Sequence, residues 1–355
     1  MTTATSHRAE SDHPSAAVPP PRASEVSLRM LPGNDVDQDA VAHLEGGGDV
    51  IFTRAYRGRV DLRNLYEKAK DNQWNARSYL DWSQKVDPEA ENVPDQFIPI
   101  FGTDVWRKLD SKRDLPNLRR HASSYLLSNF LHGEQGALLA TSQLVCCVPD
   151  PEAKLYAASQ VMDEARHVEA YERYLREKIE LTYPVSPHLE QLLQEILRES
   201  RWDLKFLGMQ IMVEGLALAA FGVISQTSQE PLIREIVRMI MLDESRHVAF
   251  GVLSLRGLYD EMTASERRDR EQFVIEASAL MRDRFLMQEV WENLGLPKEE
   301  CLDAVRNSPI MQTFQTLLFS KIVPNVKRLG LLTPDVRKAF EDLRVIQYES
   351  WDATA

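Results

Sequence analysis

The sequence predicts an all-α protein organised around a four-helix bundle, and three observations support this class. Apolar residues recur every three to four positions along most of the chain after about residue 60, and no stretch has the two-residue period of a strand. One arrangement of acidic residues and histidine occurs twice with identical spacing. The chain has 355 residues, of which 43% are hydrophobic, so it is long enough to bury one large core.

The N-terminal segment differs in composition from the rest of the chain. Residues 1–48 contain several prolines, many small polar residues and a closing run of three glycines at 46–48. They hold too few large apolar residues to offset the entropy lost on ordering. We therefore predict a disordered arm at 1–48 and a single helical domain at 49–349, with the bundle at about 115–260.

Two short helices are expected before the bundle, at 61–72 and 99–109, and should pack on its outside. The first long helix is expected at 116–148, with Pro116 in its first turn, where proline is well tolerated.

Glu134 lies in the middle of this long helix and shares a face with Phe130 and Leu131. A lone carboxylate on an apolar face is expensive to bury. The pattern therefore indicates that Glu134 has a partner in the core.

The second long helix is expected at 151–180, because Pro149 and Pro151 interrupt the first. Glu134 lies fifteen residues before Pro149, and Glu164 lies fifteen residues after it. In an antiparallel hairpin the two carboxylates therefore meet at the same height, roughly 22 Å from the turn.

The third and fourth long helices, at about 201–225 and 231–260, repeat this arrangement. Glu214 and Glu244 are again thirty residues apart, and their midpoint lies in the turn between these helices. A crossover at 181–200 with its own short helix would return the chain and let the hairpins form a bundle. One continuous helix at 187–225 is the alternative.

More helices are expected after the bundle. Thr263 and Glu266 form a capping box that begins a helix reaching about 294, which Gly295 closes. Helices at 298–306 and 308–328 follow, and Thr333 with Pro334 begins the last one.

The repeated hexapeptides at 163–168 and 243–248 read D-E-A-R-H-V and D-E-S-R-H-V. A glutamate and a histidine three residues apart lie on one face of a helix and can bind the same metal ion. With the upstream glutamates, the core receives four carboxylates, which would repel one another unless cations neutralised them. The six expected ligands are Glu134, Glu164, His167, Glu214, Glu244 and His247.

This ligand set contains oxygen and nitrogen but no sulfur. One histidine per metal and no thiolate suit iron or manganese better than zinc or copper. We therefore expect two iron ions, with manganese as the alternative.

Composition excludes several other functions. The net charge of −12 disfavours nucleic acid as a partner. Three cysteines cannot form a disulfide framework, and the N-terminus lacks the apolar core of a signal peptide, so we expect a cytoplasmic protein. The apolar run at 206–224 contains Gln210 and Glu214, which favours a buried helix over a membrane span.

The doubled motif resembles the ferritin-like di-iron carboxylate superfamily over roughly residues 115–260. The resemblance implies a ferritin-like bundle with a di-metal core, to which this chain adds N- and C-terminal helices. It also implies aspartates that accept hydrogen bonds from the ligand histidines, and arginines that pair with those aspartates. These four residues are Asp163, Arg166, Asp243 and Arg246.

The long extensions on both sides of the bundle favour a closed substrate pocket. We expect a di-iron oxidase or monooxygenase that uses O2 to hydroxylate, N-oxygenate or desaturate a small, partly apolar molecule. It would need an electron donor, and a homodimer is left open. The expected pocket walls are Leu131, Leu138, Phe221 and Met241.

Three groups of relatives compete within the superfamily. The ribonucleotide reductase small subunit and the R2-like ligand-binding oxidases are similar at 65–70 and at Tyr171. This resemblance implies a redox or substrate-adjacent role for that tyrosine; core packing is the alternative. The reductase has an aspartate where this chain has Glu134. Arylamine N-oxygenases carry an additional histidine four residues before the last glutamate, where this chain has Ile240. Acyl-carrier desaturases share the motif, but no basic patch for an acidic carrier is evident. A radical-generating metal protein or a ferroxidase remains the alternative function.

Overall fold

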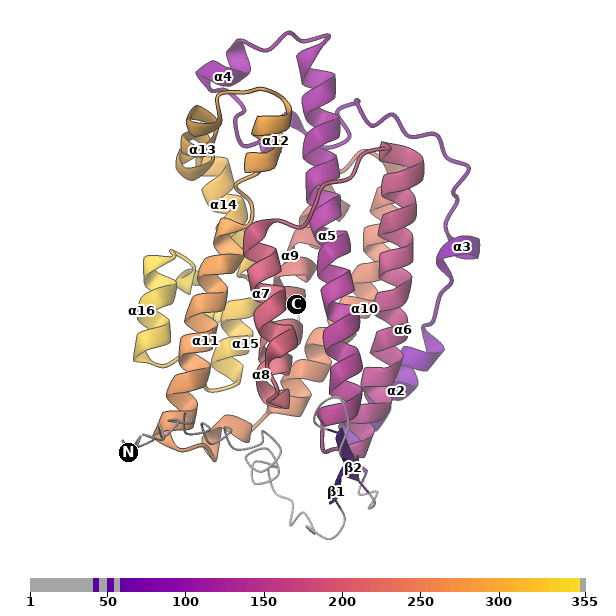
Figure 1. Cartoon of the computed structure of the whole chain (residues 1–355), viewed down its shortest axis with the longest axis vertical. Helices are drawn as coiled ribbons and strands as arrows, with labels where there is room; N and C mark the ends of the chain where they lie inside the picture. Colours follow the sequence, from indigo (N-terminus) through magenta and orange to yellow (C-terminus); the bar gives the residue numbers. More distant parts are fainter. Residues whose placement is uncertain (1–40, 45–49, 54–57, 352–355) are drawn as a thin grey trace, which may run out of the picture.

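The computed structural model describes residues 41–44, 50–53 and 58–351. Most of these residues are helical, which confirms the predicted all-α class (Figure 1). One short antiparallel hairpin was not predicted: β1 (Val41–Leu44) pairs with β2 (Val50–Thr53). The rest of the predicted arm at 1–48 lies outside the described residues.

Four long helices form the centre of the molecule, as two antiparallel hairpins (Figure 1). They are α5 (Asp114–Cys147), α6 (Pro151–Tyr174), α9 (Glu214–Thr227) and α10 (Pro231–Leu255).

Both hairpin turns end in an acidic residue followed by proline. The Asp150 side chain accepts hydrogen bonds from the first backbone N–H groups of α6, and the Glu230 side chain does the same for α10. Each cap satisfies donors that the helix cannot pair itself, and proline suits the following position. These caps place both turns where the sequence predicts them.

Two segments of the bundle have π-helical geometry. One is η3 (Leu175–Ile179), which extends α6. The other is η4 (Leu207–Val213), which joins α8 (Trp202–Phe206) to α9 and ends directly before Glu214. The predicted third helix therefore exists but changes its winding immediately before a candidate ligand, as π segments at functional sites often do.

The connection between the hairpins contains a separate helix, α7 (Pro187–Arg198). Residues 199–201 separate it from α8, so the alternative of one continuous helix over 187–225 is wrong. The helix spanning Trp202–Thr227 is long and apolar enough to cross a membrane, but 78% of its most apolar window is buried inside the protein. Burial among the other helices accounts for its composition.

Helices before the bundle cover one side of it. Helix α2 (Val60–Asp71) packs on α6 and α10, and α3 (Ala76–Tyr79) packs on α6. The turn η2 (Asp95–Phe97) and helix α4 (Asp104–Arg107) come next in the chain.

Helices after the bundle cover another side. A 3-10 turn, η5 (Leu258–Asp260), leads to α11 (Ala264–Asp283), which begins with the predicted capping box at Thr263. Its predicted end near 294 is wrong, because the chain turns at 284–287, where Met287 has a φ of 54°, before α12 (Gln288–Asn293).

The predicted helix at 308–328 is also wrong as a single element, because it is divided at 319–321. The last elements are α13 (Lys298–Asn307), α14 (Pro309–Leu318), α15 (Ile322–Arg328), α16 (Pro334–Asp342) and η6 (Ile346–Ser350).

Candidate metal centre

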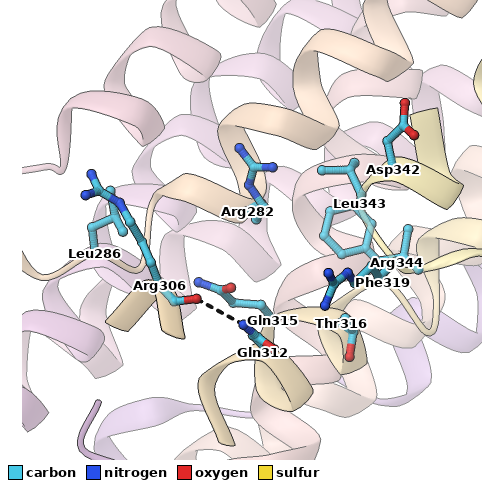
Figure 2. A pocket seen from close by; sticks show the side chains of 11 residues that line it. Arg282, Leu286, Arg306, Gln312, Gln315, Thr316, Phe319, Asp342, Leu343 and Arg344 are labelled. Carbon is cyan, nitrogen blue, oxygen red and sulfur yellow. Dashed lines mark hydrogen bonds between the residues drawn. The ribbon is translucent and has the colours of Figure 1, made fainter. Parts of the chain in front are cut away.

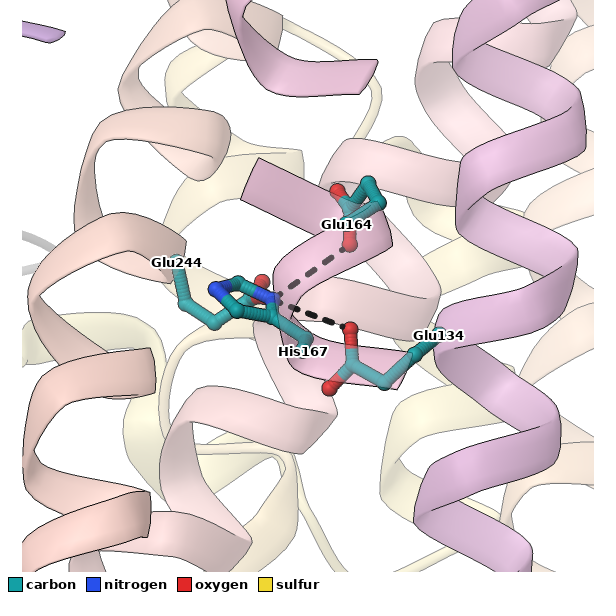
Figure 3. Close-up of side chains that lie close together, drawn as sticks. All are labelled: Glu134, Glu164, His167 and Glu244. Atoms are coloured by element: carbon teal, nitrogen blue, oxygen red, sulfur yellow. Dashed lines mark hydrogen bonds and ion pairs between the residues drawn. The ribbon is translucent and has the colours of Figure 1, made fainter. Parts of the chain in front are cut away.

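All six candidate ligands point into the interior of the bundle, and each has 5% or less of its surface exposed. Glu134 comes from α5, Glu164 and His167 from α6, Glu214 from the start of α9, and Glu244 and His247 from α10. Figure 3 shows four of them from three helices around one point. The candidate ligands meet at one level of the bundle because the two glutamates of each hairpin are equally far from its turn.

The His167 ring faces three carboxylates with its Nδ1 atom (Figure 3). This atom lies 3.2 Å from Glu134 Oε2, 3.5 Å from Glu164 Oε2 and 3.3 Å from Glu244 Oε1. Residues from both hairpins therefore surround one imidazole nitrogen.

The His247 ring has the matching arrangement. Its Nδ1 lies 3.2 Å from Glu164 Oε1, 3.5 Å from Glu244 Oε1 and 3.9 Å from Glu214 Oε2. Glu164 and Glu244 thus face both imidazoles, whereas Glu134 approaches only His167 and Glu214 only His247. This division corresponds to two metal positions with one terminal glutamate each and two glutamates shared between them.

The opposite edge of each imidazole faces an aspartate from the other hairpin. His167 Nε2 lies 3.0 Å from Asp243 Oδ2, and His247 Nε2 lies 3.3 Å from Asp163 Oδ2. A carboxylate in this position fixes the ring tautomer, because Nε2–H donates to it and Nδ1 is left to accept.

The two predicted arginines bind these aspartates. Buried Arg166 donates to Asp163 and, at 2.9 Å, to Asp243 Oδ2, while half-buried Arg246 donates to Asp243. The two aspartates and Arg166 are almost fully buried, which excludes exposed salt bridges as the explanation for these residues.

Three polar side chains that were not predicted from the sequence also contact the centre. Trp74 Nε1 donates to Asp243 at 2.7 Å, and Gln73 Nε2 donates to Asp163 at 2.8 Å. Both come from the loop between α2 and α3, where no periodicity indicates a direction. Gln160 Nε2 donates to Glu164 at 2.9 Å and to Glu214 at 2.8 Å. Its position four residues before Glu164 was a usable indication, since both lie on one helix face.

Burial and the neighbouring charges shift the pKa values of the glutamates in the cluster. Burial, together with the nearby Glu244, raises the pKa of Glu214 well above its usual value. Burial also raises the pKa of Glu134, which His167 only partly offsets. For Glu164 burial acts in the same direction, but the imidazoles of His247 and His167 outweigh it and lower the pKa.

The pKa values of the two histidines are raised, whereas the pKa of an ordinary buried imidazole is lowered. Burial alone would lower the pKa of His167, but the carboxylate of Glu134 and the hydrogen bond to Asp243 raise it well above its usual value. The pKa of His247 is raised similarly, against burial, by Glu164 and Glu244. Both shifts favour the positively charged form of the imidazoles beside these carboxylates.

Several atoms in the cluster have no hydrogen-bond partner although they are buried. They are Glu164 Oε2, Glu214 Oε2, both carboxylate oxygens of Glu244 and His247 Nδ1. Buried polar atoms are rarely left unpaired, and these atoms surround two positions where all ligand types suit divalent iron or manganese. The residues therefore fit a two-metal centre.

Tyr171 lies beside this cluster, one turn after His167. It is fully buried, its hydroxyl has no hydrogen-bond partner, and its ring packs against Phe130 and Phe221. Burial raises the pKa of Tyr171 well above its usual value, and the negative charges of Glu134 and Glu244 add a smaller effect in the same direction.

The predicted pocket walls are only partly placed at the centre. A small cavity next to the carboxylates is lined by Phe221 but not by Leu131 or Leu138. Met241 instead lines a groove on the outside of α9 and α10. A further pocket, of about 440 Å³, contains Arg282, Arg306 and Arg344 but none of the candidate ligands (Figure 2).

One family of known proteins matches this chain over most of its length. The family model described as p-aminobenzoate N-oxygenase AurF matches residues 59–330, which includes every candidate ligand. No match was found among the curated proteins.

Several solved structures are similar at low identity. A variant of an R2-like ligand-binding oxidase with an anaerobically reconstituted Mn/Fe cofactor is 17% identical, with a TM-score of 0.49, covering 78% of this chain and 95% of that one. Another R2-like ligand-binding oxidase, with an aerobically reconstituted metal cofactor after photoconversion, is 15% identical, with a TM-score of 0.47 and the same coverage. A protein with aldehyde deformylating oxidase activity from Synechococcus is 18% identical, with a TM-score of 0.46, covering 63% and 96%.

These structural likenesses are too weak to carry an argument, so the assignment depends on the family match. The match extends over most of the described chain, from the start of α2 to the end of α15. It agrees with the predicted class of a di-iron oxidoreductase that uses O2 on a small organic substrate. The chain belongs to the p-aminobenzoate N-oxygenase AurF family.

Proposed function

We propose that the protein N-oxygenates a small aromatic amine at a di-iron centre held by the six candidate ligands. One observation carries this proposal. Glu164 and Glu244 face both imidazoles, whereas Glu134 approaches only His167 and Glu214 approaches only His247. The type of reaction is supported by the family, whose model is described as an N-oxygenase. Two bound iron ions would supply O2 activation and electron transfer.

The protein's own residues would prepare and enclose this centre. Asp163 and Asp243 hold the Nε2–H of the histidines, so that each Nδ1 faces the carboxylates. Gln160 donates to one shared and one terminal glutamate and so sets the position of both. Phe130 and Phe221 pack on each other, line the small cavity beside the cluster and would limit the access of water to it.

One residue departs from the pattern of arylamine N-oxygenases. Ile240 occupies the position of their additional histidine, and it is fully buried in the apolar core. We propose that this chain uses six ligands. Gln160 lies four residues before Glu164, as Ile240 lies four before Glu244. It donates to Glu164 on its own helix and to Glu214 of the other hairpin.

A radical-generating metal protein is the second candidate function. The buried, unpartnered hydroxyl of Tyr171 favours it, because a tyrosine one turn from a ligand histidine is close enough for electron transfer. The two candidates differ in whether an organic product forms.

The protein's setting is part of the proposal. We propose a soluble cytoplasmic enzyme that takes electrons from a separate donor and has no nucleic acid or membrane as partner. The three cysteines are all free, which supports a reducing compartment. The net charge of −12 disfavours nucleic acid.

Anaerobic loading with Fe(II), followed by exposure to O2, tests the proposed function. We expect about two iron ions per chain, a change in the optical spectrum on adding O2, and an N-oxygenated product from a small aromatic amine. Protein loaded with zinc is the control and should show neither change nor product. Fewer than about two metals per chain, or no response to O2, would contradict the proposal; a response without product would favour the radical-generating alternative.

A further inference from the structure

Three arginines from different segments line the pocket of Figure 2, among the helices that follow the bundle. Arg282 lies near the end of α11, Arg306 near the end of α13, and Arg344 just after α16. All three are exposed, and Figure 2 shows them on different sides of the pocket. The one acidic residue among the described lining residues is Asp342, whose carboxylate lies 3.0 Å from Lys338 Nζ. The pocket therefore has an excess of positive charge in a chain whose net charge is −12.

Neutral polar and apolar side chains complete the wall of this pocket. Gln312, Gln315 and Thr316 of α14 supply amide and hydroxyl groups. The apolar lining residues are Leu286, Phe319, Leu343 and Val345. The volume of about 440 Å³ lies within the range of about 300–1,000 Å³ that is typical of sites for small organic molecules. The pocket thus has room for more than a single inorganic anion.

The backbone of Arg344 has a conformation that arginine rarely adopts. Its φ is 59°, which lies in the left-handed region. The Arg344 N–H donates to Glu341 O, and the Val345 N–H donates to Phe340 O, both at 2.9 Å. This pair of bonds is a Schellman motif, which closes a helix with a left-handed residue that is usually glycine. A residue with a side chain at this position lowers stability.

Two other helices after the bundle end in the same motif and carry glycine there. Gly295 closes α12 and Gly330 closes α15, with φ values of 64° and 74° and the same pair of backbone bonds. The Arg344 side chain, by contrast, forms no ion pair or hydrogen bond with the residues that the structure describes. No contact of its guanidinium within the described chain offsets the cost of the backbone conformation. Strain of this kind is typical of positions that serve binding.

We propose that this pocket is a second ligand site, which binds a small molecule with a phosphate group, and that Arg344 contacts that phosphate. A guanidinium pairs with phosphate through two parallel N–H bonds. Three arginines and one aspartate leave an excess of two positive charges, which matches a phosphate monoester of about −1.5 to −2 at pH 7. The apolar wall would hold the organic part of the ligand.

The proposed site is separate from the candidate metal centre. None of the six candidate metal ligands lines the pocket, so the phosphate-bearing ligand is not the substrate of the centre. The inference is therefore independent of the proposed N-oxygenase function.

Binding of AMP to the Fe(II)-loaded protein without O2, measured by calorimetry, tests this inference. Adenosine is the first comparison, because it lacks only the phosphate. Succinate is the second, because it carries two negative charges on carboxylates. AMP should bind, and adenosine and succinate should each bind at least about 10-fold more weakly.

Arg344→Gly separates a binding role of this residue from a structural one. Glycine removes the cation and suits the left-handed backbone, so AMP binding should weaken roughly 10-fold while the melting temperature rises by about 1–3 °C. Arg344→Asn, which also tolerates this conformation, should weaken AMP binding to the same extent. Arg328→Met is the matched control, because it removes an exposed arginine outside the pocket. It should leave AMP binding unchanged.

No binding of AMP to the wild type, or binding no tighter than that of adenosine or succinate, would overturn the inference. Unchanged AMP binding in Arg344→Gly, or a lowered melting temperature, would overturn it too, because Arg344 would then serve the fold. Glu164→Ala, which should lose its metals, should still bind AMP; loss of binding there would place AMP at the metal centre and overturn the second site. AMP binding by a protein that does not respond to O2 would contradict the proposed function and leave the phosphate site standing.

Discussion

The α5–α6 and α9–α10 hairpins carry the same motif with the same spacing, but the helices around the motifs differ. Helices α5 and α6 are regular through their candidate ligands, whereas the π segment Leu207–Val213 ends directly before Glu214. The difference shows that the repeat preserves the candidate ligands and not their surroundings. The two candidate metal positions therefore have unlike environments.

The residues one turn after the two histidines show this asymmetry. Tyr171 follows His167 and packs against aromatic rings, whereas Gly251 follows His247. A Cβ atom on Gly251 would lie only 2.6 Å from Cβ of Gln210, which belongs to the π segment. The π segment thus fills the space that a side chain at 251 would need. The tyrosine one turn after His167, with its unpartnered hydroxyl, therefore has no counterpart after His247.

Substitution of the glutamates should have the largest effects. The number of metal ions lost should differ between a glutamate that faces both histidines and one that faces a single histidine. Glu164→Ala should abolish loading of both metals, because Glu164 faces both imidazoles. Glu134→Ala and Glu214→Ala should each retain about one metal ion per chain, because each glutamate approaches a single histidine. Elemental analysis of loaded, desalted protein measures this. Two metals retained in Glu164→Ala would mean that the site is misplaced.

Lowering the pH should weaken metal binding, because Glu134, Glu214 and the two histidines then bind protons. The pKa values of Glu134, Glu214 and both histidines are raised, so these groups hold protons that a metal must displace, whereas that of Glu164 is lowered. Affinity should therefore rise with pH, by roughly tenfold per unit for each proton released. Titration with a divalent metal in weak buffer should release protons. Affinity independent of pH, or proton uptake, would contradict the assigned shifts.

A methyl group at Gly251 should destabilise the α9–α10 half. Gly251→Ala places its Cβ against Gln210 and should lower the free energy of unfolding by about 1–3 kcal/mol. Gly222→Ala is the control on α9, where the nearest atom to the new Cβ lies 3.9 Å away. It should raise stability by about 0.5–1 kcal/mol, since alanine favours the helix. Chemical denaturation of metal-free protein measures both; equal effects would mean that the π segment does not require glycine.

Substitutions of two buried glutamines should give the smallest effects. One should change metal affinity and the other stability. Gln160 donates to Glu164 and Glu214, so Gln160→Leu should lower metal affinity about tenfold. Neither polar atom of the Gln210 amide has a partner, so Gln210→Met should leave metal affinity unchanged and raise stability by about 1 kcal/mol. Metal titration and denaturation of the two variants separate these roles. A loss of affinity in Gln210→Met would place Gln210 among the residues that support the centre.

Spacing accounts for what the sequence predicted well. The two hairpins and the convergence of the six candidate ligands follow from helix geometry and from proline at each turn. Trp74 and Gln73 could not be found this way, because they reach the aspartates from an irregular loop far away in sequence. The turn at 284–287 was missed because apolar residues continue through it, and the positive φ of Met287 has no simple sequence indication.

The pocket walls show the limit of helical periodicity. Phe221 lines the cavity beside the centre, but Met241 lies on the outer side of the same hairpin. Periodicity predicts which face of a helix is apolar, and a helix in a thick core is apolar over more than one face.

Anomalous diffraction from crystals of the metal-loaded protein tests the central claim most directly. Data collected on both sides of the iron absorption edge should show two iron peaks inside the bundle. One should lie between His167 and Glu134, the other between His247 and Glu214, with Glu164 and Glu244 in contact with both. A single peak, or peaks away from these six residues, would contradict the proposal that the doubled motif forms one two-metal centre.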